Sequence, residues 1–168
     1  MEGEGSSMSE VPETSVIVTE SGDGPYAQFV TVGHHVMGAD EPEHLGGHDT
    51  GPSPYKYLLA GLGACTAMTM RNYADRHGWH VEHISVELRH EKVAVPNSAS
   101  KIDRFDRLIT LKGELTDEQR SRLLEIAENC PVSQTLRRPS IVASRLAGEE
   151  HSITTKPDSL TTRLAAKL

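Results

Sequence analysis

The sequence predicts one α+β domain built from antiparallel strands and two main helices. Segments with strand-type alternation or β-branched residues come in adjacent pairs, and capping residues mark two helix starts between them. The resulting order, β-β-α-β-β-α-β, differs from the regular strand–helix alternation of a parallel sheet. We therefore expect antiparallel hairpins that pack against helices.

Five strands are expected. The first two form a hairpin around the Ser-Gly-Asp-Gly sequence at residues 21–24, which suits a tight turn. The third is marked by the alternation of Ile84, Val86 and Leu88 with polar residues. A polar loop at residues 94–101 separates it from the fourth. In chain order, the strands are expected at residues 14–19, 26–36, 81–90, 105–111 and 141–143.

The first helix is expected to begin after Ser53, which can cap it, because Pro54 suits the first helical position. It should end near Gly78, with Arg76 and His77 in the last turn, where cations interact favourably with the helix dipole. Leucines and methionines lie around much of its circumference. A helix with apolar residues on nearly all sides is predicted to be buried.

The second helix begins at Thr116, which forms a capping-box pattern with Gln119. It is expected to stop at Cys130, because Pro131 breaks the pattern and suits the start of a short new helix.

The composition limits the possible classes of function. Hydrophobic residues make up 36% of the 168 residues, with only two Phe and one Trp, so a core shared across a dimer would add stability. The net charge is −7 and no run of five or more basic residues occurs, which argues against a nucleic-acid partner. The longest uncharged apolar-rich stretch, residues 57–70, is too short to span a bilayer.

The two ends of the chain differ from its middle. Residues 1–10 are small, polar and acidic, without the pattern of a signal peptide. We expect a disordered N-terminal tail at residues 1–12, a folded domain at residues 13–147 and a C-terminal extension at residues 148–168. Together these features predict a soluble cytoplasmic protein that does not act at a membrane.

The sequence has two cysteines, Cys65 and Cys130. A reducing compartment disfavours a structural disulfide, which leaves either buried inert thiols or a catalytic pair. Cys65 lies within the first helix among small residues, including Gly61 and Gly63, which leave room beside the sulfur. Cys130 lies at a helix break, where free backbone N–H groups can stabilise a thiolate. The residues alone leave both interpretations open.

A metal site is a second possibility. His34, His35, His44 and His48 fall within fifteen residues and have acidic neighbours, and imidazole and carboxylate groups can bind a divalent ion. The spacing matches no regular ligand pattern, and a solvated loop explains the composition equally well. We expect no metal and no other cofactor.

Two segments resemble motifs of the OsmC/Ohr family. Residues 51–66, GPSPYKYLLAGLGACT, are similar to the family's central-helix signature, and residues 126–133, IAENCPVS, to its second cysteine motif. The resemblance covers roughly residues 14–146, and paired motifs at this separation are fairly specific. The PSPY sequence and residues 35–42 are more similar to the OsmC-like branch than to the classical Ohr branch.

This resemblance implies an intertwined homodimer in which antiparallel sheets wrap around two central helices. It also implies a thiol peroxidase that reduces small organic hydroperoxides in oxidative-stress defence. Cys65 matches the peroxidatic cysteine and Cys130 the resolving one. A sulfenic acid on Cys65 would condense with Cys130 to a disulfide, which an unidentified thiol reductant would recycle.

The chain departs from the peroxidase pattern at the activating cation. The family uses an arginine from the first hairpin, held by a glutamate that begins the central helix. Here no arginine precedes Arg71, and Tyr55 occupies the glutamate position. The alternative function is therefore a catalytically weak OsmC-like dimer that binds a small apolar ligand at the interface. The candidate substitute cations are Lys56 and Arg71, which face away from Cys65 on the same helix, and Arg89, Arg104, Arg107, His34 and His35.

Overall fold

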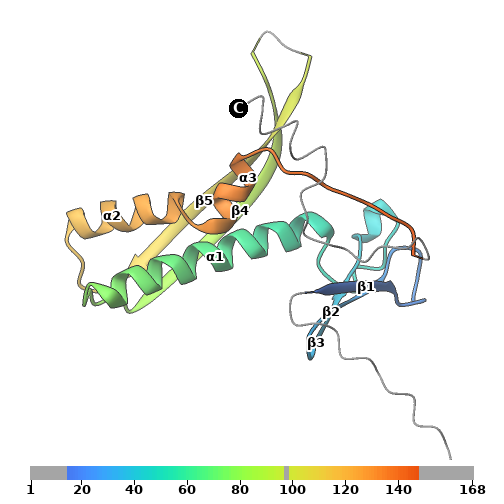
Figure 1. The fold of residues 1–168 in the computed structure, drawn as a ribbon, viewed down its shortest axis with the longest axis horizontal. Coiled ribbons are helices and arrows are strands. Elements are labelled where there is room, and N and C mark those ends of the chain that lie inside the picture. Colours follow the sequence, from blue (N-terminus) through green and yellow to red (C-terminus); the bar gives the residue numbers. More distant parts are fainter. Residues whose placement is uncertain (1–14, 97–98, 148–168) are drawn as a thin grey trace, which may run out of the picture.

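A computed structural model describes residues 15–96 and 99–147 of the chain, and it confirms the α+β class (Figure 1). The tail expected at residues 1–12 and the extension expected at residues 148–168 lie outside the described residues. The elements in chain order are β1 (Val16–Glu20), β2 (Gln28–Val32), β3 (His35–Ala39), the 3-10 helix η1 (Glu43–Leu45), α1 (Pro54–Arg76), β4 (His83–Ala94), β5 (Lys101–Lys112), α2 (Asp117–Glu128) and α3 (Pro131–Arg137).

The first three strands form an antiparallel sheet in the order β1-β2-β3. The prediction of a single strand over residues 26–36 was wrong, because the chain reverses at Gly33 and His34 and continues as β3. Gly33 has a φ of 55°, and positive φ at the first position of a two-residue turn matches the twist of a hairpin. A turn of two residues between Val32 and His35 is difficult to distinguish from a continuing strand by alternation alone.

Helix α1 is the element against which β4, α2 and α3 pack. Its start at Ser53 and Pro54 is as predicted, and it ends at Arg76. The expectation of burial on nearly all sides was wrong for the single chain. The buried side chains form one stripe at every fourth position, namely Leu62, Thr66, Met70 and Ala74, whereas Met68 is 70% exposed.

Strands β4 and β5 form a long antiparallel hairpin that runs along α1 (Figure 1). Both strands extend further than predicted, because residues 91–94 pair with residues 101–104, and the ends of the loop expected at residues 94–101 belong to the strands. One face of the hairpin turns toward α1 and α2. The core cluster between these elements consists of Met70, Ala74, Val81, Leu123 and Ala127.

Helix α2 begins with the predicted capping box. The Gln119 backbone N–H donates to Thr116 Oγ1 at 3.2 Å, and the Thr116 N–H donates to Gln119 Oε1 at 2.9 Å. The predicted break is also confirmed, because Cys130 is the N-cap of α3 and Pro131 its first residue.

The strand predicted at residues 141–143 is not formed. These residues have no regular secondary structure, and Val142 is 90% exposed. A β-branched pair such as Ile141-Val142 favours extended backbone, but a strand also needs a partner with free hydrogen-bonding groups. In the described part of the chain, β4 and β5 pair only with each other.

Candidate functional site

The two cysteines are both free thiols and differ in exposure. Cys65 lies in the middle of α1 beside the buried stripe and is half-buried. Cys130 lies at the junction of α2 and α3 and is fully buried. A small solute can therefore approach Cys65 more readily than Cys130 in the single chain.

Thr66 connects the helix that carries Cys65 to the other cysteine. Its hydroxyl oxygen lies 3.5 Å from Cys130 Sγ, although the two residues are 64 positions apart in the sequence. The Thr66 hydroxyl donates its one hydrogen to the carbonyl of Leu62 at 2.7 Å. The thiol of Cys130 must therefore be the donor to Thr66 Oγ1. The fold thus brings the two cysteine motifs together, with Thr66 in direct contact with the second thiol.

Arg107 is a buried cation at the same point. It lies on the face of β5 that turns toward α1, and its side chain is only 8% exposed. Its Nη1 donates to Thr66 Oγ1 at 3.0 Å and to the carbonyl of Ala127 at 2.8 Å, and its Nη2 donates to Glu128 Oε1 at 2.9 Å. A buried charge needs such partners, and here they come from α1 and the end of α2. Arg107 therefore links the strand, both helices and, through Thr66, the Cys130 thiol.

Glu128 joins this cluster to α3. Its second carboxylate oxygen pairs with Arg137 Nη2, and Arg137 Nη1 donates to the backbone carbonyl of Glu128 at 3.3 Å. One carboxylate is thus shared by the two guanidinium groups of Arg107 and Arg137. The contacts between Glu128 and Arg137 thus join the residues that precede and follow Cys130 in the chain.

The start of α3 adds a further contact to Cys130. The backbone N–H of Ser133 donates to Cys130 Sγ at 3.4 Å. This agrees with the prediction that backbone N–H groups at the helix break face the sulfur. A thiolate at this position would accept that N–H, and it could accept the Thr66 hydroxyl after rotation of its hydrogen away from Leu62.

Among the candidate substitute cations, Arg107 is the one that the structure brings to a cysteine motif. It contacts Thr66 and lies on the Cys130 side rather than beside the Cys65 thiol. Arg89 pairs with Glu87 and Arg104 with Asp106, both at the surface. Arg71 donates to the carbonyl of Val81.

The small residues around Cys65 have different surroundings. A Cβ on Gly63 would lie 2.7 Å from Leu88 Cδ1, so β4 already occupies the space that this glycine leaves. A Cβ on Gly61 would have nothing within 4 Å among the described residues. The open space beside Cys65 is therefore on the outer face of α1, away from the hairpin.

Tyr55, at the position where the resemblance implies a glutamate, packs on a histidine. Its ring stacks on His90 with centroids 4.4 Å apart and planes 10° apart, and His90 also stacks on Phe105. His90 Nε2 lies 2.8 Å from Asp103 Oδ1. The start of α1 thus packs on an aromatic stack in which His90 also pairs with Asp103.

The loop that leads into α1 is organised by Asp40, which is 3% exposed. Its carboxylate accepts the backbone N–H groups of Glu41, His48 and Thr50 and the Thr50 hydroxyl, at 2.8–3.2 Å. Burial raises the pKa of Asp40, but these hydrogen bonds outweigh it, so the pKa is lowered from its ordinary value of 3.8. The carboxylate therefore acts as an ionised structural anchor.

Sequence reasoning did not single out Thr66, Glu128 or Arg137, and it named Arg107 only as one cation among several. A signal was present for Arg107, because it alternates with Phe105, Ile109 and Leu111 on the inward face of β5. A charged residue in an apolar row indicates either that the strand alternation is interrupted there or that the charge is buried and has partners.

No metal centre is found in the histidine-rich segment. Within residues 15–96 and 99–147, no group of three or more His, Cys, Asp or Glu side chains is arranged to hold a metal ion. The rings of His34 and His35 pack on each other, with centroids 3.9 Å apart. None of the helices in the same described ranges combines the length and hydropathy that a bilayer crossing needs.

Comparisons with known proteins agree with this architecture. The family model described as OsmC-like protein matches residues 47–144. This segment is more than half of the chain and contains both cysteines, so the chain belongs to the OsmC-like family. No curated protein sequence matches it.

Solved structures show the same fold at low sequence identity. An OsmC-like protein from Mycoplasma pneumoniae is 16% identical with a TM-score of 0.61, over 73% of this chain and 86% of that one. An organic hydroperoxide resistance protein OsmC from Legionella pneumophila is 22% identical with a TM-score of 0.55, over 73% and 89%. The organic hydroperoxide resistance protein OhrB of Bacillus subtilis is 21% identical with a TM-score of 0.53, over 73% and 90%.

Proposed function

We propose that this chain is a cysteine-based thiol peroxidase that reduces small organic hydroperoxides. The observation that carries the proposal is the contact between Thr66, the neighbour of Cys65, and the Cys130 thiol. Two cysteines far apart in the sequence lie on elements that pack together, as a peroxidatic and resolving pair requires. The names of the Legionella and Bacillus proteins, which refer to hydroperoxide resistance, also support it.

Exposure suggests which thiol does which step. A hydroperoxide must reach the attacking sulfur, and Cys65 is half-buried whereas Cys130 is fully buried. In the proposed reaction, the Cys65 thiolate attacks the outer peroxide oxygen, the O–O bond breaks, and the alkoxide leaves and takes a proton. Cys65 is then a sulfenic acid. Cys130 attacks its sulfur, forming the disulfide and releasing water, and an external thiol reductant restores both thiols.

The proposal includes a homodimer. Strand β1 is exposed along its whole length, and large apolar side chains on the first sheet and on α1 are uncovered in the single chain. An exposed apolar surface of this kind marks an interaction surface. The uncovered side chains include Val16, Ile17, Val18, Phe29, Val36, Leu58 and Met68. Light scattering after gel filtration should give twice the mass of the chain, and the mass of one chain would contradict this part of the proposal.

The peroxidase step is tested with single serine variants, because the chain has no third cysteine. With excess cumene hydroperoxide, the wild type should form a Cys65–Cys130 disulfide, detected by non-reducing mass spectrometry. Cys130→Ser should accumulate a Cys65 sulfenic acid that dimedone traps. Cys65→Ser should consume peroxide only at the background rate of methionine oxidation.

Unchanged peroxide consumption by Cys65→Ser would refute the peroxidase proposal. The alternative of a catalytically weak dimer that binds a small apolar ligand would then remain. It predicts slow modification of Cys65 and a thermal shift with apolar ligands that persists in Cys65→Ser.

A further inference from the structure

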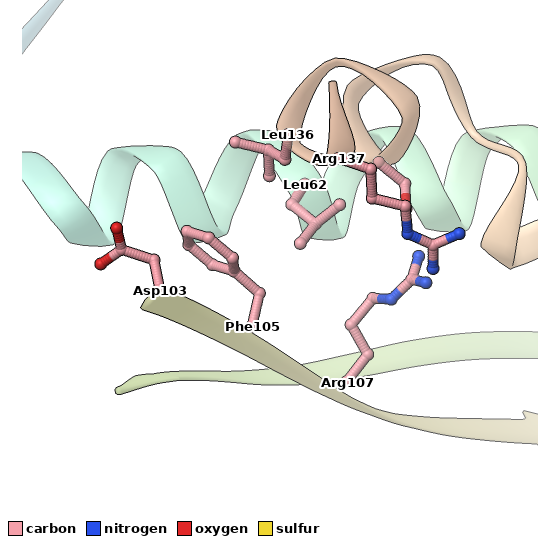
Figure 2. Close-up of a pocket in the computed structure, with 7 residues that line it drawn as sticks. Leu62, Asp103, Phe105, Arg107, Leu136 and Arg137 are labelled. Atoms are coloured by element: carbon pink, nitrogen blue, oxygen red, sulfur yellow. The ribbon is translucent and has the colours of Figure 1, made fainter. Parts of the chain in front are cut away.

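A cavity of about 280 Å³ lies between the first half of α1, strand β5 and helix α3 (Figure 2). Its lining residues come from all three elements and have distinct chemical character. Leu62, Phe105 and Leu136 form an apolar wall, while Arg107 and Arg137 bring their guanidinium groups to one end. No sequence motif marks this cavity, and the proposed peroxidase reaction does not use it.

The arginine end carries an excess of positive charge. Figure 2 shows the two guanidinium groups beside each other, and Glu128 is the one carboxylate that pairs with both. Two positive charges thus face one negative charge. The contacts of Arg107 with Thr66, Ala127 and Glu128 account for three of the five N–H donors that a guanidinium has. A further anionic oxygen would therefore find both charge and donors at this end.

The opposite end has the opposite charge. Asp103 lines the cavity beyond Phe105, away from the guanidinium groups. Asp103 is paired with His90. Because Asp103 is itself a carboxylate, this end of the cavity disfavours a second anion. A ligand with one carboxylate would be oriented by this difference, and a ligand with a carboxylate at each end would be repelled by Asp103.

We propose that this cavity binds a small monocarboxylate with an apolar body. The carboxylate would lie against Arg107 and Arg137, because arginine matches carboxylate geometry with paired N–H donors. The apolar body would lie against Leu62, Phe105 and Leu136 and be removed from water there. The volume of about 280 Å³ is near the lower end of the range for ligand pockets, roughly 300–1,000 Å³, so we expect a short or medium-length chain such as octanoate. This inference does not depend on the peroxidase activity.

The test is calorimetric titration of the full-length protein with octanoate, octanol and suberate at fixed ionic strength. Octanoate should bind saturably. Octanol should bind more weakly because it lacks the charge, and suberate because its second carboxylate would lie near Asp103. Arg137→Gln should weaken octanoate binding about tenfold or more, because it removes charge-assisted hydrogen bonds. Arg104→Gln removes an exposed arginine from the other face of β5 and should change the affinity less than about twofold.

A second variant tests the cavity itself without altering its charges. Leu136→Trp fills the apolar part and should abolish octanoate binding while the melting temperature stays close to that of the wild type. Three results would each overturn the proposal: no saturable binding of octanoate up to millimolar concentration, equal affinity for octanol, or equal affinities of the Arg137→Gln and Arg104→Gln variants.

Discussion

Replacing Arg107 by Met gives the sharpest test of the cluster around Cys130. Met keeps an unbranched apolar stem but removes the charge and the N–H donors. The change deletes the hydrogen bonds to Thr66 Oγ1, the Ala127 carbonyl and Glu128. Since both Thr66 and Ala127 are fully buried, water cannot replace the donors that they lose.

The size of the effect follows from what each partner keeps. Glu128 is 45% exposed and still pairs with Arg137, so its loss is small. The Ala127 carbonyl retains the Cys130 N–H at 3.4 Å, a long bond. Removing the buried charge also recovers part of its desolvation cost. We expect the free energy of unfolding to fall by about 2–3 kcal/mol, which corresponds to a melting temperature lower by roughly 5–10 °C.

The assay is thermal unfolding followed by circular dichroism at fixed protein concentration, since dimerisation would make the midpoint depend on concentration. Arg104→Met is the matched control on the same strand. Arg104 is 57% exposed and its ion pairs lie at the surface, so we expect a change of less than about 0.5 kcal/mol. If both variants unfold at the same temperature, the hydrogen bonds of Arg107 to Thr66 and Ala127 do not stabilise the fold.

Two further predictions concern elements outside the cluster. Thr116→Ala removes the cap of α2 and should lower the free energy of unfolding by about 1 kcal/mol in urea titration, whereas Ser121→Ala in the same helix should not; equal midpoints would contradict the capping role. Asp40 has a lowered pKa in the folded protein, so its stabilising contribution is complete above its ordinary pKa of 3.8 and is lost as the pH falls through the folded value. The stability difference between the wild type and Asp40→Asn should therefore shrink below pH ~4, and a difference that stays constant down to pH 2 would refute it.

Local signals in the sequence were sufficient for much of the fold. The start of α1 at Ser53-Pro54, the capping box at Thr116 and the break at Cys130 were all predicted correctly. Each depends on residues within one helical turn of each other, where the backbone conformation follows from local hydrogen bonding and sterics. The α+β class followed because hairpins and helix caps are likewise short-range features.

The errors have two sources: alternation alone does not locate a tight turn, and some elements depend on a partner that is distant in the sequence. The alternation over residues 26–36 was real, but the turn at Gly33 became visible only through the pairing of β2 with β3. Residues 141–143 have suitable side chains for a strand and no strand beside them in the described structure. The exposure of α1 likewise depends on what packs against it rather than on its own residues.

The sequence by itself determined the class of fold, the two cysteine motifs and the family to which they are similar. Only the tertiary structure decided that the Cys130 thiol contacts Thr66. It also decided that Arg107, among the candidate cations, donates a hydrogen bond to Thr66. The physical reason is separation along the chain. Arg107 and Thr66 are 41 positions apart and Cys130 lies 64 positions beyond Thr66, so their meeting is set by how β5, α1 and α3 pack.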